Sequence, residues 1–404
     1  MLSDLRAPGI YIREEPGPRP IQAVGTSTAG FVGVAPAAKA HLDEVIPINN
    51  WTQFVREFVP DEGAASTPLS QAVHGFFLNG GSRLFVVNVG RDGAIAGGRG
   101  RSPLDLLAQI DEIAIVAAPG YTDAVTYDAV ISHCEQAGDR VAILDAPGNV
   151  RDVTLLTDVA TVEADAADGE EAEEGAADAG GDREGLRPRS SSYGALYFPW
   201  ITVFDPLSSE IVDVAPSGHI AGIWARSDAA RGVHKAPANE IVRGALNVTY
   251  HLTRAEQGDL NQSGINCIRF FTDEGILVWG ARTLDSDGEW RYLNVRRLFN
   301  MIKESIANST RWIVFEPNDR PLWKAIQRDV GAFLTGLWRE GALMGRTADE
   351  AFFVKCDEET NPQDQIDRGV VTTWIGIAPV KPAEFVVFRI SQVESGAEIE
   401  LRGG

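Results

Sequence analysis

The chain has 404 residues, a formal net charge of −21 and 44% hydrophobic residues, enough apolar side chains to build roughly two or three globular domains. The acidic balance argues against a nucleic-acid-binding protein, because phosphate contacts need clustered Lys and Arg. Cys134, Cys267 and Cys356 are far apart and form no Cys-x-x-Cys pair, which argues against a disulfide scaffold and a cysteine zinc site.

The acidic charge is concentrated in one stretch. Between Glu163 and Glu184 there are ten acidic residues and one Arg, which account for −9 of the net −21. Residues 163–185 are almost entirely Ala, Asp, Glu and Gly, and such a segment buries too little apolar surface to offset the entropy of ordering it. We therefore expect a disordered insertion on the surface. A cation-binding role lacks the ligand spacing of a calcium loop.

The N-terminus lacks the apolar segment of a signal peptide. The longest uncharged run near it, 20–38, is interrupted by glycines and prolines, which disfavours a membrane-spanning helix. We expect a protein that is made in the cytoplasm without a signal peptide and does not insert into membranes.

The first predicted element is a strand over 9–15. Pro8 precedes it, and Pro16, Pro18 and Pro20 follow it. Because prolines interrupt regular pairing, the strand is separated from the next unit. This arrangement is typical of an arm rather than of a core strand.

From Gly25 onward the pattern predicts an α/β unit. Asn50 and Gln53 suggest a capping box, Thr67 precedes a proline in the favoured first helical position, Thr122 is a candidate N-cap, and Gly138 is a helix stop. Strands that alternate with helices at this spacing predict parallel pairing with right-handed crossovers. The predicted strands cover 29–34, 84–89, 113–118 and 141–144, and the helices cover 51–58, from Thr67–Pro68 to Gly80–Gly81, and from Thr122 to Gly138.

The last third of the chain predicts a helix over 295–306, a strand over 312–315 and a long helix from Asn318 to about Met344. In the long helix Trp323, Ile326, Val330, Leu334 and Leu337 form one apolar stripe. At 100° per residue, four basic side chains fall on roughly the opposite side. These are Arg320, Lys324, Arg328 and Arg339. A solvated face that aids solubility is the alternative interpretation.

An apolar strand is predicted over 385–390, after Pro379 and Pro382. Both of its faces are apolar, so it must be covered by other parts of the protein. It either completes a sheet of its own chain or enters that of a neighbour.

Motifs for catalysis or cofactor binding are absent from the sequence. It contains no Gly-Lys dipeptide of a phosphate-binding loop, no Gly-x-Gly-x-x-Gly after a strand and no His-Glu-x-x-His. The segment around Ser27 resembles the nucleophile region of a subtilisin-type protease, but Ser27 precedes every histidine, so a permuted triad would be needed. His133 and Cys134 are adjacent on a helix and point in different directions. We expect no catalytic residue, cofactor or metal.

Several short motifs, each weak alone, occur in an order that resembles the contractile tail sheath family, and most closely the sheaths of phage-like contractile injection systems. Residues 8–15 resemble the "PGVYVEE" opening of that family, and 76–81 resemble its "FFxNGG" helix end. The other matching segments are 19–21, 25–33, 216–222, 235–239, 260–266, 279–284, 294–298, 315–318 and 382–385. The acidic segment 163–185 has no counterpart in this pattern.

The resemblance implies a multidomain α/β sheath protein. An N-terminal arm, residues 1–24, joins an inner domain formed by residues 291–404, and residues 25–290 form the outer α/β region with the acidic insertion. Such a subunit polymerises around an inner tube, in what are expected to be stacked hexameric rings, and contracts to drive the tube through a target envelope. Baseplate and tail-terminator cap proteins are further expected partners, in a phage tail or tail-like particle.

The resemblance also implies roles for particular residues. The arms add strands to neighbouring subunits, and the long basic helix faces the tube. The candidate arm residues are Ile10, Tyr11, Ile12, Arg13 and Glu14, with Phe385, Val386, Val387, Phe388, Arg389 and Ile390; the candidate tube-facing residues are Arg320, Lys324, Arg328 and Arg339. Pairing of each strand within its own subunit, a non-contractile shell or tube protein, and an α/β hydrolase are the alternatives.

Overall fold

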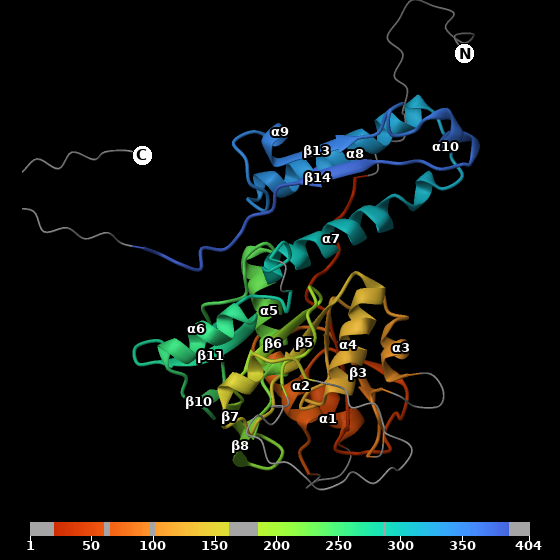
Figure 1. Cartoon of the computed structure of the whole chain (residues 1–404). Coiled ribbons are helices and arrows are strands. Elements are labelled where there is room, and N and C mark those ends of the chain that lie inside the picture. The colour runs from red at the N-terminus through yellow and green to blue at the C-terminus, as the bar shows by residue number, and fades with distance from the viewer. Residues whose placement is uncertain are drawn as a thin grey trace, which may run out of the picture.

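The computed structural model describes residues 20–59, 65–91, 93–96, 102–160, 185–285 and 288–387. The strand expected over 9–15, most of the acidic insertion and residues 388–390 lie outside these ranges. The described chain has a large α/β body, between residues 25 and 292, and a smaller C-terminal unit, residues 310–380. The long helix α7 (Leu293–Ser309) joins the two (Figure 1).

Within the described ranges, the main sheet of the body has nine strands in the order β2-β3-β1-β4-β5-β6-β11-β12-β9. The pairs from β3 to β11 are parallel, and antiparallel strands close both edges. Every residue of β1, β3, β5 and β6 is buried, as expected for a parallel sheet covered on both faces. The strands are β1 (Ala29–Gly33), β2 (Val45–Ile48), β3 (Leu84–Asn88), β4 (Ile115–Ala117), β5 (Val141–Asp145), β6 (Gly194–Phe198), β9 (Glu240–Ile241), β11 (Ile265–Phe271) and β12 (Gly275–Trp279).

Helices cover both faces of this sheet, which confirms the expected α/β class. One face packs against α1 (Trp51–Phe58), α2 (Pro68–Leu78) and α5 (Ser217–Arg231) through Phe54, Phe76 and Trp224, for example. The other packs against α3 (Pro103–Leu107), α4 (Ala124–Ala137) and α6 (Arg254–Gln262), together with the short 3-10 helix η1 (Val153–Leu156).

The helix ends follow the local sequence closely, with two corrections. Thr67 and Ser70 form a reciprocal capping box at α2, and Gly138 ends α4 in the left-handed conformation (φ 71°). Asp123, not Thr122, caps α4, because its carboxylate accepts the backbone N–H of Thr126. Asn50 caps α1, but the Gln53 side chain accepts the backbone N–H of Asn49 rather than that of Asn50.

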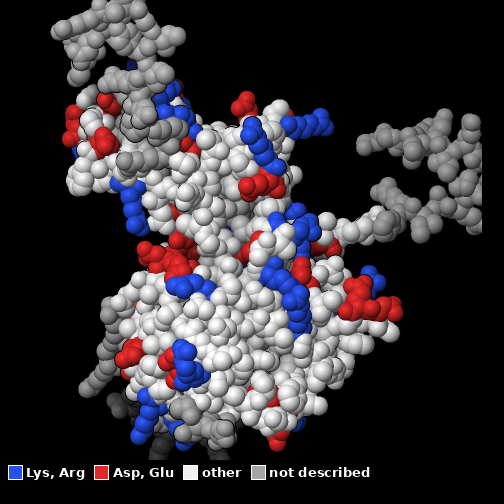
Figure 2. All heavy atoms as spheres, turned by 180° about the vertical axis from the view of Figure 1, so that it is seen from behind, with Lys and Arg blue, Asp and Glu red and all other residues white. Residues whose placement is uncertain are grey.

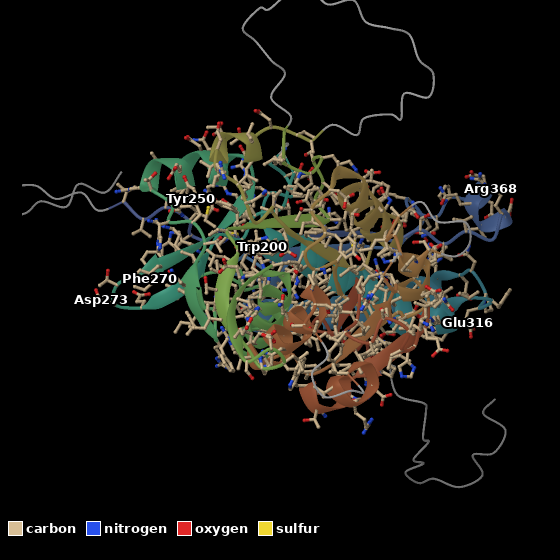
Figure 3. The ribbon with its side chains drawn as sticks, turned by 90° about the horizontal axis from the view of Figure 1, so that it is seen from below. Trp200, Tyr250, Phe270, Asp273, Glu316 and Arg368 are labelled. Carbon is tan, nitrogen blue, oxygen red and sulfur yellow. The ribbon has the colours of Figure 1, made fainter. Side chains whose placement is uncertain are left out.

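A second sheet of the body has the order β10-β7-β8, with strands β7 (Ile201–Asp205), β8 (Glu210–Val214) and β10 (Ala245–Val248). Its outer face carries the cross-strand pair Phe204 and Ile211, which are 52% and 66% exposed. Nearby, the β11–β12 hairpin carries Phe270 and Asp273 away from the body, on the side opposite to Glu316 and Arg368 of the C-terminal unit (Figure 3).

The C-terminal unit consists of helices over a two-stranded antiparallel sheet. The sheet pairs β13 (Phe352–Lys355) with β14 (Trp374–Ile377), and the predicted stripe of the long helix α8 (Arg320–Arg339) is buried beneath it. The shorter helices are η2 (Arg311–Ile313), α9 (Ala348–Ala351) and α10 (Gln363–Asp367).

The strand predicted over 312–315 is wrong. Residues 311–313 form the 3-10 helix η2, in which the Ile313 N–H bonds to the Thr310 carbonyl oxygen. Phe315 follows with a positive φ of 73° and a fully exposed ring. A short apolar run has no periodicity that separates a strand from a turn of helix. The long helix also ends before Met344, because Gly341 takes a left-handed conformation (φ 80°).

Asp145 joins the strand ends of the body to α5. Its buried carboxylate accepts the backbone N–H (2.8 Å) and the hydroxyl (2.7 Å) of Ser217, and the N–H of Gly120 (3.1 Å). The Asp145 carboxylate therefore caps the start of α5, where Pro216 supplies no side-chain cap. Burial raises the pKa of Asp145 to about 6, although these donors act in the opposite direction.

We predict a pH signature for Asp145. Because its folded pKa lies above the value of about 4 in an unfolded chain, its contribution to the free energy of unfolding falls as pH rises from about 4 to about 6 and is constant above that. Asp145→Asn does not titrate, so its stability relative to the parent should increase over the same pH interval. Urea unfolding across this interval measures the difference, and a pH-independent difference would contradict the assignment.

Candidate functional site

An ion pair fastens α7 to the body. Arg297 donates to both carboxylate oxygens of Asp228 on α5, at 2.9 and 2.5 Å, and these side chains are only 3% and 5% exposed. The Arg297 guanidinium also donates to the carbonyl oxygen of Thr26 (3.0 Å) and lies over the Trp224 ring. Thr26 completes the cluster by donating its hydroxyl to Asp228 (2.6 Å). Three segments far apart in sequence are thereby held at one point.

Arg296, the neighbouring residue on α7, fills the other side of this junction. Its guanidinium carbon lies 3.6 Å from the centroid of the Trp290 ring and 4.5 Å from that of Tyr193, which places the cation between two aromatic groups. One turn further along α7, Asn300 borders a very small cavity. One face of the first half of α7 therefore packs on the body, whereas Leu298 and Met301 pack in the core of the C-terminal unit.

The N-terminal segment is attached to the far end of α7. The backbone N–H groups of Gln22 and Val24 donate to the hydroxyls of Ser309 (3.2 Å) and Ser305 (3.0 Å). Ile21 is buried in the core of the C-terminal unit. The chain therefore reaches β1 from the C-terminal unit, and residues 21–24 of the arm predicted over residues 1–24 lie along α7.

The C-terminal segment is attached to the near end of α7. The Asn294 side-chain amide donates to the Val380 carbonyl oxygen (3.0 Å), and the Val380 N–H donates to Ala342 (3.3 Å). Further on, Glu384 forms an ion pair with Arg282 of the body. Asn294 and Ser309 are separated by about 22 Å of helix at 1.5 Å per residue.

The described part of the predicted terminal strand has no regular structure in the isolated chain. Phe385, Val386 and Val387 are 76%, 69% and 81% exposed. Consecutive apolar side chains rarely remain in water unless another surface covers them. Their exposure fits a segment whose partner is another molecule.

The β13–β14 sheet has unpaired backbone on both outer edges within the described residues. Its inner face packs on the core of the C-terminal unit, whereas Phe353 and Trp374 on its outer face are 57% and 54% exposed. Isolated two-stranded sheets are marginally stable, and free edges attract further strands. The backbone groups on these two edges are therefore available to pair with an added strand.

The basic residues predicted on α8 are exposed on one helix, as the helical spacing indicated. Arg320 pairs with Glu358, and the Arg328 Nε atom donates to the Asp329 carboxylate at 2.8 Å. The Lys324 ammonium donates to the Gln327 amide at 3.0 Å. Arg339 is exposed in the last turn of α8.

Of the residues considered for catalysis, His133 and Cys134 are buried, and so is a further histidine, His219. His219 of α5 lies against Gly75 of α2, and burial lowers its pKa to about 3. His133 and Cys134 are buried on α4, and burial lowers the pKa of His133 to about 4. Ser27 lies in the loop before β1.

The described residues offer neither a cluster suited to a metal ion nor a helix suited to span a membrane. No cluster of three or more His, Cys, Asp or Glu side chains in the described ranges is arranged to hold a metal ion. No helix among them has the length and apolarity to cross a membrane.

Comparison with known proteins finds two matching family models. The model described as the phage tail sheath protein central domain matches residues 103–284, and that of the phage tail sheath C-terminal domain matches residues 285–392. Among curated proteins, the tail sheath protein of Salmonella phage ViI is 28% identical over 300 residues, which is 72% of this chain and 46% of that protein. The matched regions span between 31% and 49% of the curated relatives.

Solved structures match over nearly the whole chain. A chain from the baseplate of the anti-feeding prophage in its contracted state is 30% identical, with a TM-score of 0.73 and coverage of 96% of this chain and 99% of that one. A chain of the PVC extracellular contractile injection system, from the sheath complex in its contracted state, is 27% identical, with a TM-score of 0.76 and coverage of 96% and 98%.

We predict that the α7 junction is a main source of stability. Arg297→Ala leaves the Asp228 carboxylate buried without its partner, which costs about 3–5 kcal/mol for such pairs. The mutant should unfold at a clearly lower temperature in calorimetry. Arg311→Ala is the matched control, because Arg311 follows α7 and is 73% exposed, so its effect should stay within about 0.5 kcal/mol. Equal melting temperatures for the two mutants would refute the role of Arg297.

Proposed function

The chain belongs to the phage tail sheath family, and from this premise we propose that it polymerises around an inner tube and contracts to drive the tube through a target envelope. The observation that supports this most strongly is the combination of an incomplete sheet with an uncovered apolar segment in one chain. The β13–β14 sheet has free edges, and residues 385–387 are exposed. Strands from neighbouring subunits would complete the β13–β14 sheet and cover the apolar segment.

The arms are proposed to join subunits by strand addition, with main-chain hydrogen bonds between the donated strand and the acceptor sheet. Residues 10–14 would supply one strand and residues 385–390 the other. The two segments leave the subunit at opposite ends of α7, so each subunit can reach different neighbours. Main-chain hydrogen bonds tolerate rotation of the domains that they link, so the proposed lattice can stay connected during contraction.

We also propose which parts of the chain form the inner and outer layers of the sheath. Residues 291–404 and the N-terminal arm, residues 1–24, form the inner layer, and residues 25–290 form the outer layer. The acidic insertion starts beyond Ala160 of the body, and its high charge suits a solvated outer surface. Rings of six subunits, a baseplate below and a cap protein above complete the proposed particle.

The energy for contraction is proposed to come from repacking between subunits. The sequence contains no phosphate-binding loop, and His133 and Cys134 are buried on α4. We infer a structural, non-enzymatic role without a cofactor, in a phage tail or a tail-like particle. No described feature favours a hydrolase or a static shell, so neither is proposed.

Deletion of the arms tests the assembly mechanism. Removal of residues 1–19, or of residues 385–404, should leave a folded chain that forms no sheaths, because the body and the C-terminal unit keep their cores. Negative-stain electron microscopy reports the sheaths, and circular dichroism reports the fold. Removal of residues 391–404 alone should leave assembly intact. Full-length sheaths from either arm deletion would contradict strand addition.

The tube-facing role of α8 predicts a charge effect. Each exposed ion pair contributes only about 0–1 kcal/mol, but repetition over many subunits would hold the tube before firing. Lys324→Glu combined with Arg328→Glu should lower the fraction of purified sheaths that contain a tube, and added salt should lower it in the parent. Arg368→Glu, on α10, is the control. Unchanged occupancy in the double mutant would reject this assignment.

A further inference from the structure

The chain returns to the body after it has built the C-terminal unit (Figure 1). It leaves through α7 and forms α8, β13 and β14. Directly after β14, the Ala378 carbonyl oxygen accepts the Met344 N–H at 2.7 Å. After Val380, it runs along the body toward residue 387. The return segment, residues 381–387, connects the C-terminal unit to the predicted donor strand.

Glu384 attaches this return segment to the body. Its carboxylate accepts hydrogen bonds from Arg282 Nε (2.8 Å) and Nη2 (2.5 Å), a bidentate geometry. The side chains are 8% exposed for Arg282 and 16% for Glu384, so water screens the pair weakly. The Tyr292 hydroxyl lies 3.5 Å from the same carboxylate.

Arg282 is itself held rigidly. Its backbone N–H donates to the Asn266 side-chain oxygen (2.7 Å), and the Asn266 amide donates to the Arg282 carbonyl oxygen (2.8 Å). Its Nη1 atom donates to the carbonyl oxygen of Asn261 (2.8 Å). The guanidinium therefore presents its remaining donors to Glu384 from a defined position on the body.

The residues next to Glu384 in the sequence are more exposed than Glu384 itself. Lys381 and Ala383 are exposed, and so are Phe385 and Val386. A groove of about 850 Å³ runs beside this segment. Figure 2 shows Lys and Arg side chains on the side of the molecule where the described C-terminal segment leaves it. Its lining includes the basic residues Arg231, Lys235, Arg254 and Lys381. These basic residues attract a carboxylate, and Glu384 is the half-buried anchor of the described part of the return segment.

We propose that Arg282 and Glu384 are arm-positioning residues, which set the point and direction at which the C-terminal arm leaves the subunit. This inference rests on the proposed function, because the arm is the segment proposed to pair with a neighbour. The donor strand begins at Phe385, directly after the anchor. Without the anchor, the last backbone attachment is Val380, and four more residues add up to about 14 Å of free chain. The strand would then search a larger volume, and its effective concentration at the acceptor sheet would fall.

A distance measurement tests the anchor in the full-length chain, independently of assembly. Spin labels at Gly258→Cys, where a Cβ meets open space, and at Val386→Cys flank the groove, and the native cysteines are buried. Labelled chain diluted into unlabelled chain should give a narrow distance distribution. Glu384→Ala and Glu384→Gln should broaden it, Lys381→Ala should not, and Arg282→Glu with Glu384→Arg should narrow it again. A broad distribution in the parent, or a narrow one in both Glu384 mutants, would overturn the anchor.

Assembly of the same variants separates this inference from the proposed function. If the parent forms no sheaths, the proposed function fails while the distance measurement still decides the anchor. If the parent forms sheaths, Glu384→Gln should form severalfold fewer at a temperature at which circular dichroism shows both chains to be folded, and the charge-exchanged pair should recover part of the yield. Equal sheath yields from the parent and Glu384→Gln would overturn the arm-positioning role.

Discussion

The free edges of the β13–β14 sheet are the constraint on which the proposed assembly depends. Backbone N–H and C=O groups need partners, and a two-stranded sheet leaves a row of them open on each side. The C-terminal unit adds exposed aromatic side chains, Phe353 and Trp374, beside those edges. The same chain carries an uncovered apolar segment, residues 385–387, that its own core does not bury. The proposed acceptor and donor are thus both present in each subunit, and the proposed pairing between subunits would satisfy both.

The junction at α7 connects the proposed strand pairing to the α/β body. Arg297, Asp228 and Thr26 hold α7, α5 and the entry to β1 together in a buried cluster, so displacement of an arm root moves the whole body. The arm roots lie at opposite ends of the same helix. In the proposed sheath, contraction would move the α/β body as a unit and leave the strand pairing between subunits in place.

The features that could be predicted from the sequence are those encoded by residues close together in the chain. The apolar strands of the body, the Thr67 cap and the Gly138 stop are encoded within a few residues, and the basic face of α8 follows from helical spacing. The strand predicted over 312–315 failed because four apolar residues carry no decisive period. The Arg282–Glu384 pair joins residues 102 positions apart, and Arg297 joins Asp228 across 69, so no spacing rule could have matched these partners. The family resemblance indicated arms but not where they are rooted.

A cryo-electron microscopy map of particles assembled from the full-length chain tests the central claim most directly. We predict sheaths in a long and a short form, with a strand from a neighbouring subunit hydrogen-bonded to a free edge of the β13–β14 sheet in both. Sheaths in which that sheet remains two-stranded, or a chain that stays monomeric at every concentration, would contradict assembly by strand addition.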